Sequence, residues 1–256
     1  MSSIAADRLA RSECLGGYFD LQLTFAARMA ERGRTPFTEA VARYTNLHRR
    51  FGQGDIDLVP PSAAWTNFLD QLDHLQSTEA RVALARAVYA RSPEEPPPVG
   101  QTAFGCFSCE APNADGAVRL HFNNRDCDDE VGPLDQAKTG ARSGELAALF
   151  GFVRERHPHA RSVLGGSWLY NVEAYRRLFP PAYAASRHPP PSPLRLSGSS
   201  SWGQFLDHRG ALKPDLAQWF LAGLDRLDPA TPSRAFPLPA LRAEAPVALF
   251  YGFYGV

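Results

Sequence analysis

The sequence predicts a mixed α/β protein in two parts, a helical bundle over residues 1–95 and a mixed β-sheet flanked by helices over residues 100–256. Apolar residues recur every three or four positions through the first part, as on one face of a helix. After residue 100 the spacing changes to the alternation that is typical of strands. Between the parts lies SPEEPPPVG, residues 92–100, where three successive prolines stop helical structure. We place the domain boundary there.

Four helices are expected in the first part, without a chemical motif. The first covers residues 5–32 and is interrupted by a pair of glycines, and the second covers 36–51, where Thr35 caps the helix. Ser62 opens the third helix, and Thr78 caps the fourth. Their apolar faces could form a lid, a dimer interface or a cover for the sheet, so a homodimer is one open alternative.

The second part begins with a predicted β-hairpin, in which the runs 102–110 and 117–123 are strands joined by the turn sequence PNADG. The later elements predicted by periodicity are, in chain order, helix 144–156, strand 161–169, helix 171–179, helix 214–227 and strand 247–256. Helix 214–227 is expected to bury Trp219, and the last strand is expected to close the sheet.

Composition excludes several classes of function. The 256 residues include 27 Lys and Arg against 27 Asp and Glu, so no net charge attracts nucleic acid or an anionic membrane. The N-terminus does not resemble a signal peptide, and no apolar stretch approaches the roughly 20 residues that span a bilayer. We expect a cytoplasmic protein whose four cysteines remain thiols.

The first candidate site is QAKTGARSG, residues 136–144, directly before a predicted helix. A glycine-rich turn at a helix N-terminus directs backbone N–H groups and the helix dipole toward an anion such as a pyrophosphate. Lys138 or Arg142 would add a charge-assisted contact. The alternative interpretation is a solvated loop before an ordinary helix.

Over residues 136–179 the order of glycine turn, helix, strand and short helix resembles the coenzyme A-binding half of the GNAT N-acetyltransferases. In that family a Q/R-x-x-G-x-G/A turn cradles the pyrophosphate, and a later helix carries a tyrosine. The matching residues here are Gln136, Gly140, Arg142 and Gly144 in the turn, and Asn171 and Tyr175 in the later helix. The spacing inside the turn differs from the family pattern. The resemblance implies a splayed pair of parallel strands beside Gly140 and an acyltransferase that uses acetyl-CoA, or a similar phosphate-bearing ligand, on a small-molecule amine.

The same resemblance implies catalytic roles. Tyr175 would protonate the leaving thiolate, and His121 or Glu110 would take the proton from the amine. His121 is favoured because the ordinary pKa of histidine lies near neutrality. The alternative is a strand histidine whose hydrogen bonds are satisfied within the fold.

The spacing C-x2-C-x11-H-x5-C, formed by Cys106, Cys109, His121 and Cys127, is close to that of small zinc sites. A zinc-containing enzyme is therefore a further hypothesis. Residues three apart in a strand point to opposite faces, which separates the first two cysteines unless the chain turns at Gly105. We expect buried thiols and no metal.

Polar and aromatic residues in two further segments are candidates for a small-molecule pocket. They are Ser167, Trp168, Asp207, His208 and Arg209. No G-x-S-x-G sequence is present, so a serine nucleophile lacks its usual setting. A small-molecule or partner-binding protein without catalytic activity is the alternative to the transferase.

Overall fold

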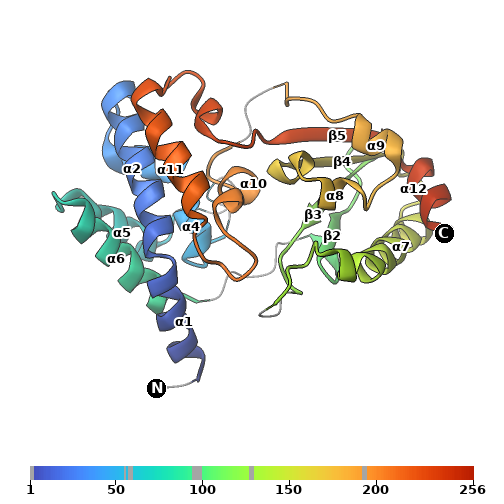
Figure 1. Cartoon of the computed structure of the whole chain (residues 1–256), viewed down its shortest axis with the longest axis horizontal. Coiled ribbons are helices and arrows are strands. Elements are labelled where there is room, and N and C mark those ends of the chain that lie inside the picture. The colour runs from blue at the N-terminus through green and yellow to red at the C-terminus, as the bar shows by residue number, and fades with distance from the viewer. Residues whose placement is uncertain (1–2, 55, 57–59, 94–99, 127–129, 192–194) are drawn as a thin grey trace. The chain divides into compact units, whose positions relative to one another are not determined.

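The computed structural model describes residues 3–54, 56, 60–93, 100–126, 130–191 and 195–256 (Figure 1). Within them the chain forms twelve α-helices and a five-stranded mixed sheet, which confirms the predicted mixed α/β class. None of the helices in these ranges is both long and apolar enough to cross a bilayer.

The chain divides into two compact units that differ from the predicted parts. The first unit comprises Met1–Pro96 and Pro193–Pro237, and the second comprises Pro97–Ser192 and Leu238–Val256. Residues 193–237 join the helical unit because three of their aromatic rings pack against Phe25, at centroid distances of 5.3 to 5.6 Å. These rings belong to Trp202, Phe220 and Phe236. Local periodicity does not reveal a contact between such distant segments.

The first unit is helical. Its helices are α1 (Ser3–Cys14), α2 (Gly16–Gly33), α3 (Phe37–Tyr44), α4 (Leu47–Arg50), α5 (Ala63–Asp73), α6 (Thr78–Arg91), α10 (Ser199–Trp202) and α11 (Pro214–Gly223). Ser62 caps α5 as predicted, with its Oγ accepting from Trp65 N at 3.1 Å. The cap of α6 is Ser77, one residue before the predicted Thr78.

The helix predicted over residues 36–51 is divided into α3 and α4. Thr45 leaves helical geometry, and its hydroxyl donates to Val41 O at 2.7 Å. The next backbone N–H, of Asn46, donates to Gln22 Oε1 on α2 at 2.8 Å. The Thr45 backbone N–H still donates to Val41 O, whereas the Asn46 N–H bonds to the buried Gln22 side chain and not to a helical carbonyl.

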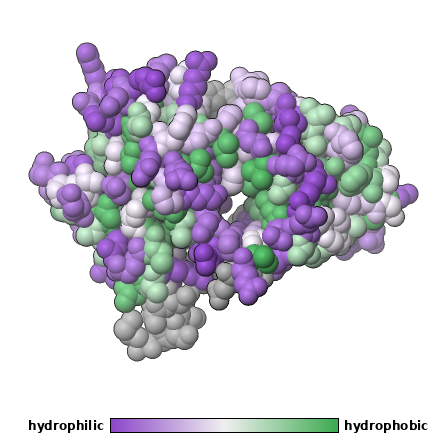
Figure 2. Space-filling model, viewed as in Figure 1, coloured by the Kyte–Doolittle hydropathy of each residue, from purple (hydrophilic) through white to green (hydrophobic). Residues whose placement is uncertain are grey.

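The prediction that Trp219 is buried is wrong, because 57% of this residue is exposed. The neighbouring Phe220 is fully buried, so the buried stripe of α11 runs through Phe220 and not through Trp219. Elsewhere, hydrophobic residues are scattered among hydrophilic ones on the surface seen in Figure 2.

The second unit contains the sheet. Its elements are β1 (Gln101–Phe104), β2 (Phe107–Glu110), β3 (Ala117–Phe122), α7 (Thr139–Arg156), β4 (Ser162–Ser167), α8 (Glu173–Arg176), α9 (Pro181–Ala185), β5 (Leu241–Pro246) and α12 (Val247–Tyr254). The strands lie in the order β1-β2-β3-β4-β5. All neighbours are antiparallel except β3 and β4, which are parallel and joined by α7.

The predicted strand 102–110 is two strands, because the chain reverses at Gly105. This glycine has a φ of +59°, a value that favours glycine. The carboxyl group of Glu145, on α7, occupies the place that a side chain at position 105 would need. A tight turn and a close packing contact therefore both require glycine here.

The prediction of a strand over residues 247–256 is wrong, because residues 247–254 form α12. The closing strand is β5, which ends at Pro246, and this proline is the N-cap of the helix. A short apolar run does not distinguish a buried strand from a buried helix by periodicity. Only one residue of the run before Gly255, Val247, is β-branched.

The two faces of the sheet differ. Pairing places Cys109, Leu120 and Val163 on one face, where they form a core with residues of α7, α8, α9 and α12. The opposite face carries mainly polar side chains. They include Gln101, Ser108, Glu110, Arg119, His121, Arg242 and Glu244. We call these the apolar face and the polar face.

Candidate functional site

His121 and Glu110 form a pair on the polar face. His121 is the cross-strand partner of Ser108, and Glu110 follows Ser108 by two residues, so the three side chains share a face. His121 Nε2 lies 2.7 Å from Glu110 Oε1. This hydrogen bond lowers the pKa of Glu110, although partial burial opposes the effect. An ionised carboxylate that orients an imidazole is the arrangement of a general base.

The parallel strands β3 and β4 separate toward their carboxyl ends. Their mutual pairing ends at Leu120 and Gly165, although β3 continues to Phe122 and β4 to Ser167. Over these last residues β3 remains paired with β2, and β4 with β5. Because α7 follows β3, this helix begins at the same edge of the sheet. The carboxyl ends of parallel strands are where open α/β sheets bind ligands.

A cluster of three buried tyrosines lies under this point, on the apolar face. Tyr170 Oη is 2.6 Å from Tyr183 Oη, and the rings of Tyr170 and Tyr175 are 5.3 Å apart. Burial raises the pKa of all three phenols. The Tyr170 hydroxyl occupies the place that a Cβ at Gly165 would need. The structure therefore puts Tyr175 on the opposite face from His121, and it adds Tyr170 and Tyr183, which the sequence alone did not single out.

The predicted glycine turn over 136–144 is largely helix. Gln136–Lys138 form a turn of 3-10 helix, and α7 begins at Thr139, so Gly140 and Gly144 both lie within α7. Both glycines are exposed, with open space where a Cβ would stand. Of the predicted glycine turn, only the part around Gly140 lies at the N-terminus of a helix, where an anion could bind.

Arg142, predicted to contact phosphate, is buried and bound to acidic side chains within the fold. Its Nη2 lies 2.6 Å from Asp126 Oδ2 and 2.8 Å from Glu145 Oε1, and its Nη1 donates to Cys106 Sγ. Lys138 Nζ lies 3.2 Å from Asp126 Oδ1, and the hydrogen bond from Lys138 is the largest influence that lowers the pKa of Asp126. Arg142 thus fastens the turn between β1 and β2 to α7.

In the described part of the chain, the predicted zinc ligands do not lie together. Cys109 pairs with Leu120, the neighbour of His121, so Cys109 and His121 point to opposite faces of the sheet. Burial raises the pKa of Cys106, and it raises that of Cys109 to about 11. Cys127 lies outside the described residues. Within the described ranges, no three His, Cys, Asp or Glu residues could hold one metal ion.

The candidate pocket residues are divided between the units. Ser167 and Trp168 belong to the second unit, whereas Asp207, His208 and Arg209 belong to the first. Ser167 Oγ accepts from the backbone two residues later. Asp207 Oδ1 accepts backbone N–H bonds from positions 209 and 211, at 2.8 and 2.9 Å. Both side chains therefore stabilise local turns.

Asn171, predicted to bind the cofactor, also has a structural role. Its Nδ2 donates to Trp168 O at 2.8 Å and to Pro239 O at 2.7 Å. These bonds tie the segment after β4 to the segment before β5. An amide whose donors are used in this way is poorly placed to contact a ligand.

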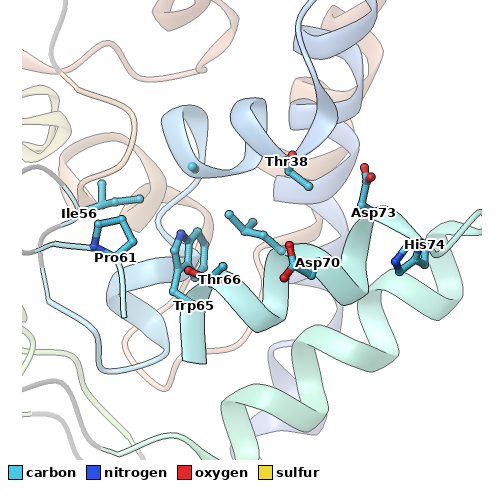
Figure 3. A pocket seen from close by; sticks show the side chains of 10 residues that line it. Thr38, Ile56, Pro61, Trp65, Thr66, Asp70, Asp73 and His74 are labelled. Atoms are coloured by element: carbon cyan, nitrogen blue, oxygen red, sulfur yellow. The ribbon is translucent and has the colours of Figure 1, made fainter. Parts of the chain in front are cut away.

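The first unit contains a groove of about 640 Å³ between α3 and α5 (Figure 3). Its lining residues are Thr38, Ala42, Ile56, Pro61, Trp65, Thr66, Leu69, Asp70, Asp73 and His74. From sequence, α5 was predicted only as one helix of a bundle, and the groove was not predicted. The available signal was the recurrence of Trp65, Leu69 and Asp73 at intervals of four, which puts two apolar residues and an acid on one helical face.

Comparison of the chain with models of known families, with characterised proteins and with solved structures gives no match.

Proposed function

We propose that the second unit binds a coenzyme A thioester where β3 and β4 separate, and that it transfers the acyl group to a small-molecule amine. The observation that carries this proposal is the loss of pairing beyond Leu120 and Gly165 while the outer strands remain paired. The facing edges of the two strands no longer bond to each other there. They can instead pair with an extended ligand that has amide groups, such as the pantetheine arm of coenzyme A.

The topology supports the same proposal. Three antiparallel strands lead into a parallel pair joined by α7, and an antiparallel strand follows. A splayed parallel pair beside Gly140 is what the resemblance to the GNAT N-acetyltransferases implies. Gly140 is the second residue of the helix that joins the pair.

The side chains near the separation could supply the proton transfers. His121, oriented by Glu110, would take a proton from the amine as its nitrogen attacks the thioester carbonyl. The new C–N bond forms, the C–S bond breaks, and the thiolate takes up a proton. Tyr175 and Tyr170, whose hydroxyl lies at Gly165, are the candidate donors of this proton. Burial raises the pKa of these phenols, so they are protonated at neutral pH but are weaker acids than a free tyrosine.

For the phosphate contacts we propose groups other than the two cations expected from sequence. Arg142 and Lys138 are bound to Asp126. We assign the pyrophosphate to backbone N–H groups in the first turn of α7 other than that of Thr139, which donates to Gln136 O, together with the helix dipole.

A thermal-shift titration with acetyl-CoA tests the proposal. At 100 times Kd the ligand should add about 2.7 kcal/mol of stability. Release of free thiol with a panel of small amines then tests turnover. No stabilisation at millimolar acetyl-CoA would contradict the proposal.

Substitutions at Gly140 sharpen this test. Gly140→Asp places a carboxylate in the first turn of α7, where it should stabilise the unliganded protein by about 0.3–1 kcal/mol and repel a pyrophosphate. Gly140→Ala is the matched control, because the Cβ enters open space without adding charge. We expect acetyl-CoA to stabilise the alanine variant normally and the aspartate variant much less. Equal stabilisation of both variants would show that the phosphates do not bind at the N-terminus of α7.

A further inference from the structure

The groove in the first unit has two chemically different ends. In Figure 3 Ile56 and Pro61 lie together at one end, and Asp73 and His74 lie at the other. Trp65 lies between them on α5, and it is buried against the core by edge contacts such as that with His48, at 4.9 Å. The apolar end is therefore built on a rigid base.

The acidic end carries two carboxylates on one side of α5. Asp70 and Asp73 are three residues apart, so they lie on the same side of the helix, and both are exposed. Neither forms an ion pair or hydrogen bond with another part of the chain that the structure describes. Thr38, on α3, lines the groove on the side opposite α5 (Figure 3). Two unpaired negative charges thus stand beside an apolar surface.

We propose that this groove binds an amphipathic organic cation, with an apolar body against Trp65 and Leu69 and an ammonium group beside Asp70 and Asp73. A volume of about 640 Å³ is within the usual range of small-ligand sites. The ammonium group would supply the charge that the chain leaves uncompensated. The proposal concerns the first unit alone and does not depend on the activity of the second.

Binding of three six-carbon probes to the whole chain tests the charge requirement. Calorimetric titration would compare hexylamine, hexanol and hexanoate at neutral pH, where the first is a cation, the second neutral and the third an anion. We expect hexylamine to bind at least about tenfold more tightly than hexanol, and hexanoate to bind least, in accordance with the two carboxylates. Equal binding of the amine and the alcohol would overturn the proposal.

A double substitution locates the contact. Asp70→Asn with Asp73→Asn should weaken hexylamine binding by about tenfold and leave hexanol binding unchanged. Both positions are exposed, so the fold should tolerate the change. The matched control is Glu79→Gln with Asp215→Asn, which alters the net charge equally at exposed sites outside the groove. If the control weakens hexylamine binding equally, the effect is that of net charge and the site is refuted.

A cation built into the groove gives an independent result. Thr38→Lys would place an ammonium group in the groove that Asp70 and Asp73 line, so it should raise the melting temperature and compete with hexylamine. Thr38→Met, of similar length but uncharged, is the control and should reduce binding less. A lysine variant that is no more stable than the methionine variant and binds hexylamine equally well would contradict the proposal.

Discussion

The two faces of the sheet in the second unit are built from the same strands but differ in chemistry. The apolar face is covered by four helices, and hydroxyl groups buried there are bonded within the fold, as those of Tyr170 and Tyr183 are. The polar face carries a histidine and a carboxylate that are partly exposed, with side-chain exposures of 29% and 37%. A single alternation along each strand thus separates buried side chains that form the core from polar side chains that remain partly exposed.

The largest effect should come from Arg142, which fastens the β1–β2 turn to the helix on the apolar face. Arg142→Met removes the cation that pairs with Glu145 and leaves Asp126 with Lys138 alone. Removal of one partner of a buried pair is strongly destabilising, and because these carboxylates retain some exposure we expect a loss of about 2–4 kcal/mol. Urea unfolding would measure it.

Lys138→Met is the control for Arg142, because the lysine binds the same Asp126 nearer the surface. It should cost less than about 1 kcal/mol. If Arg142→Met is as stable as the parent protein but no longer responds to acetyl-CoA, the arginine is a phosphate ligand and the sequence-based prediction was right.

Two adjacent glycines of β4 give the most direct comparison of the faces. Gly165→Ala would force a methyl group against the hydroxyls of Tyr170 and Tyr183, at a cost of about 1–3 kcal/mol. Gly166→Ala points to the polar face, where a Cβ meets open space, and should change stability by less than about 0.5 kcal/mol. Chemical denaturation of the two variants would measure the difference.

Removal of the obstructing hydroxyl tests the cause of the Gly165 effect. Tyr170→Phe should cost less in the Gly165→Ala background than in the parent protein, because the clash is relieved. Additive effects would show that the clash with Tyr170 is not what destabilises the variant.

The smallest effect concerns the pair on the polar face. The pKa of Glu110 is lowered in the folded state, so its stabilising contribution is present above the unfolded value of about 4.3 and is lost as the pH falls through the folded value. Glu110→Gln should therefore cost up to about 1 kcal/mol at pH 7 and less at pH 3, where part of the stabilising contribution is lost. Unfolding at the two pH values would show this. A cost that is independent of pH would mean that the carboxylate charge contributes nothing.

Features that depend on neighbouring residues were predictable from sequence. The proline run, the cap at Ser62 and the change from helical to strand periodicity identified the class and several helices. His121 and Glu110 were both selected as proton carriers, and the structure brings them within 2.7 Å. Alternation along β2 and β3 already placed each of them on one face of its strand.

Features that depend on distant contacts were not predictable in the same way. Arg142 looks like a surface cation in sequence, and only the packing of the β1–β2 turn on α7 shows that it is buried. The exposure of Trp219 and the helical state of residues 247–254 likewise depend on which neighbour covers each side. The tyrosine cluster combines residues from three short segments around one glycine, which a single sequence does not reveal.

The division of the first unit into two chain segments affects the order in which the protein can fold. When the ribosome has made the first hundred residues, Phe25 and Tyr18 still lack Trp202, which packs at 5.6 and 6.4 Å from them in the finished core. The Trp202 indole also donates to Tyr44 O, so a hydrogen bond links the two segments as well. The nascent helices must therefore keep aromatic surface exposed until nearly all of the chain has been synthesised. A chain shortened at residue 193 would leave that surface permanently uncovered and prone to aggregation.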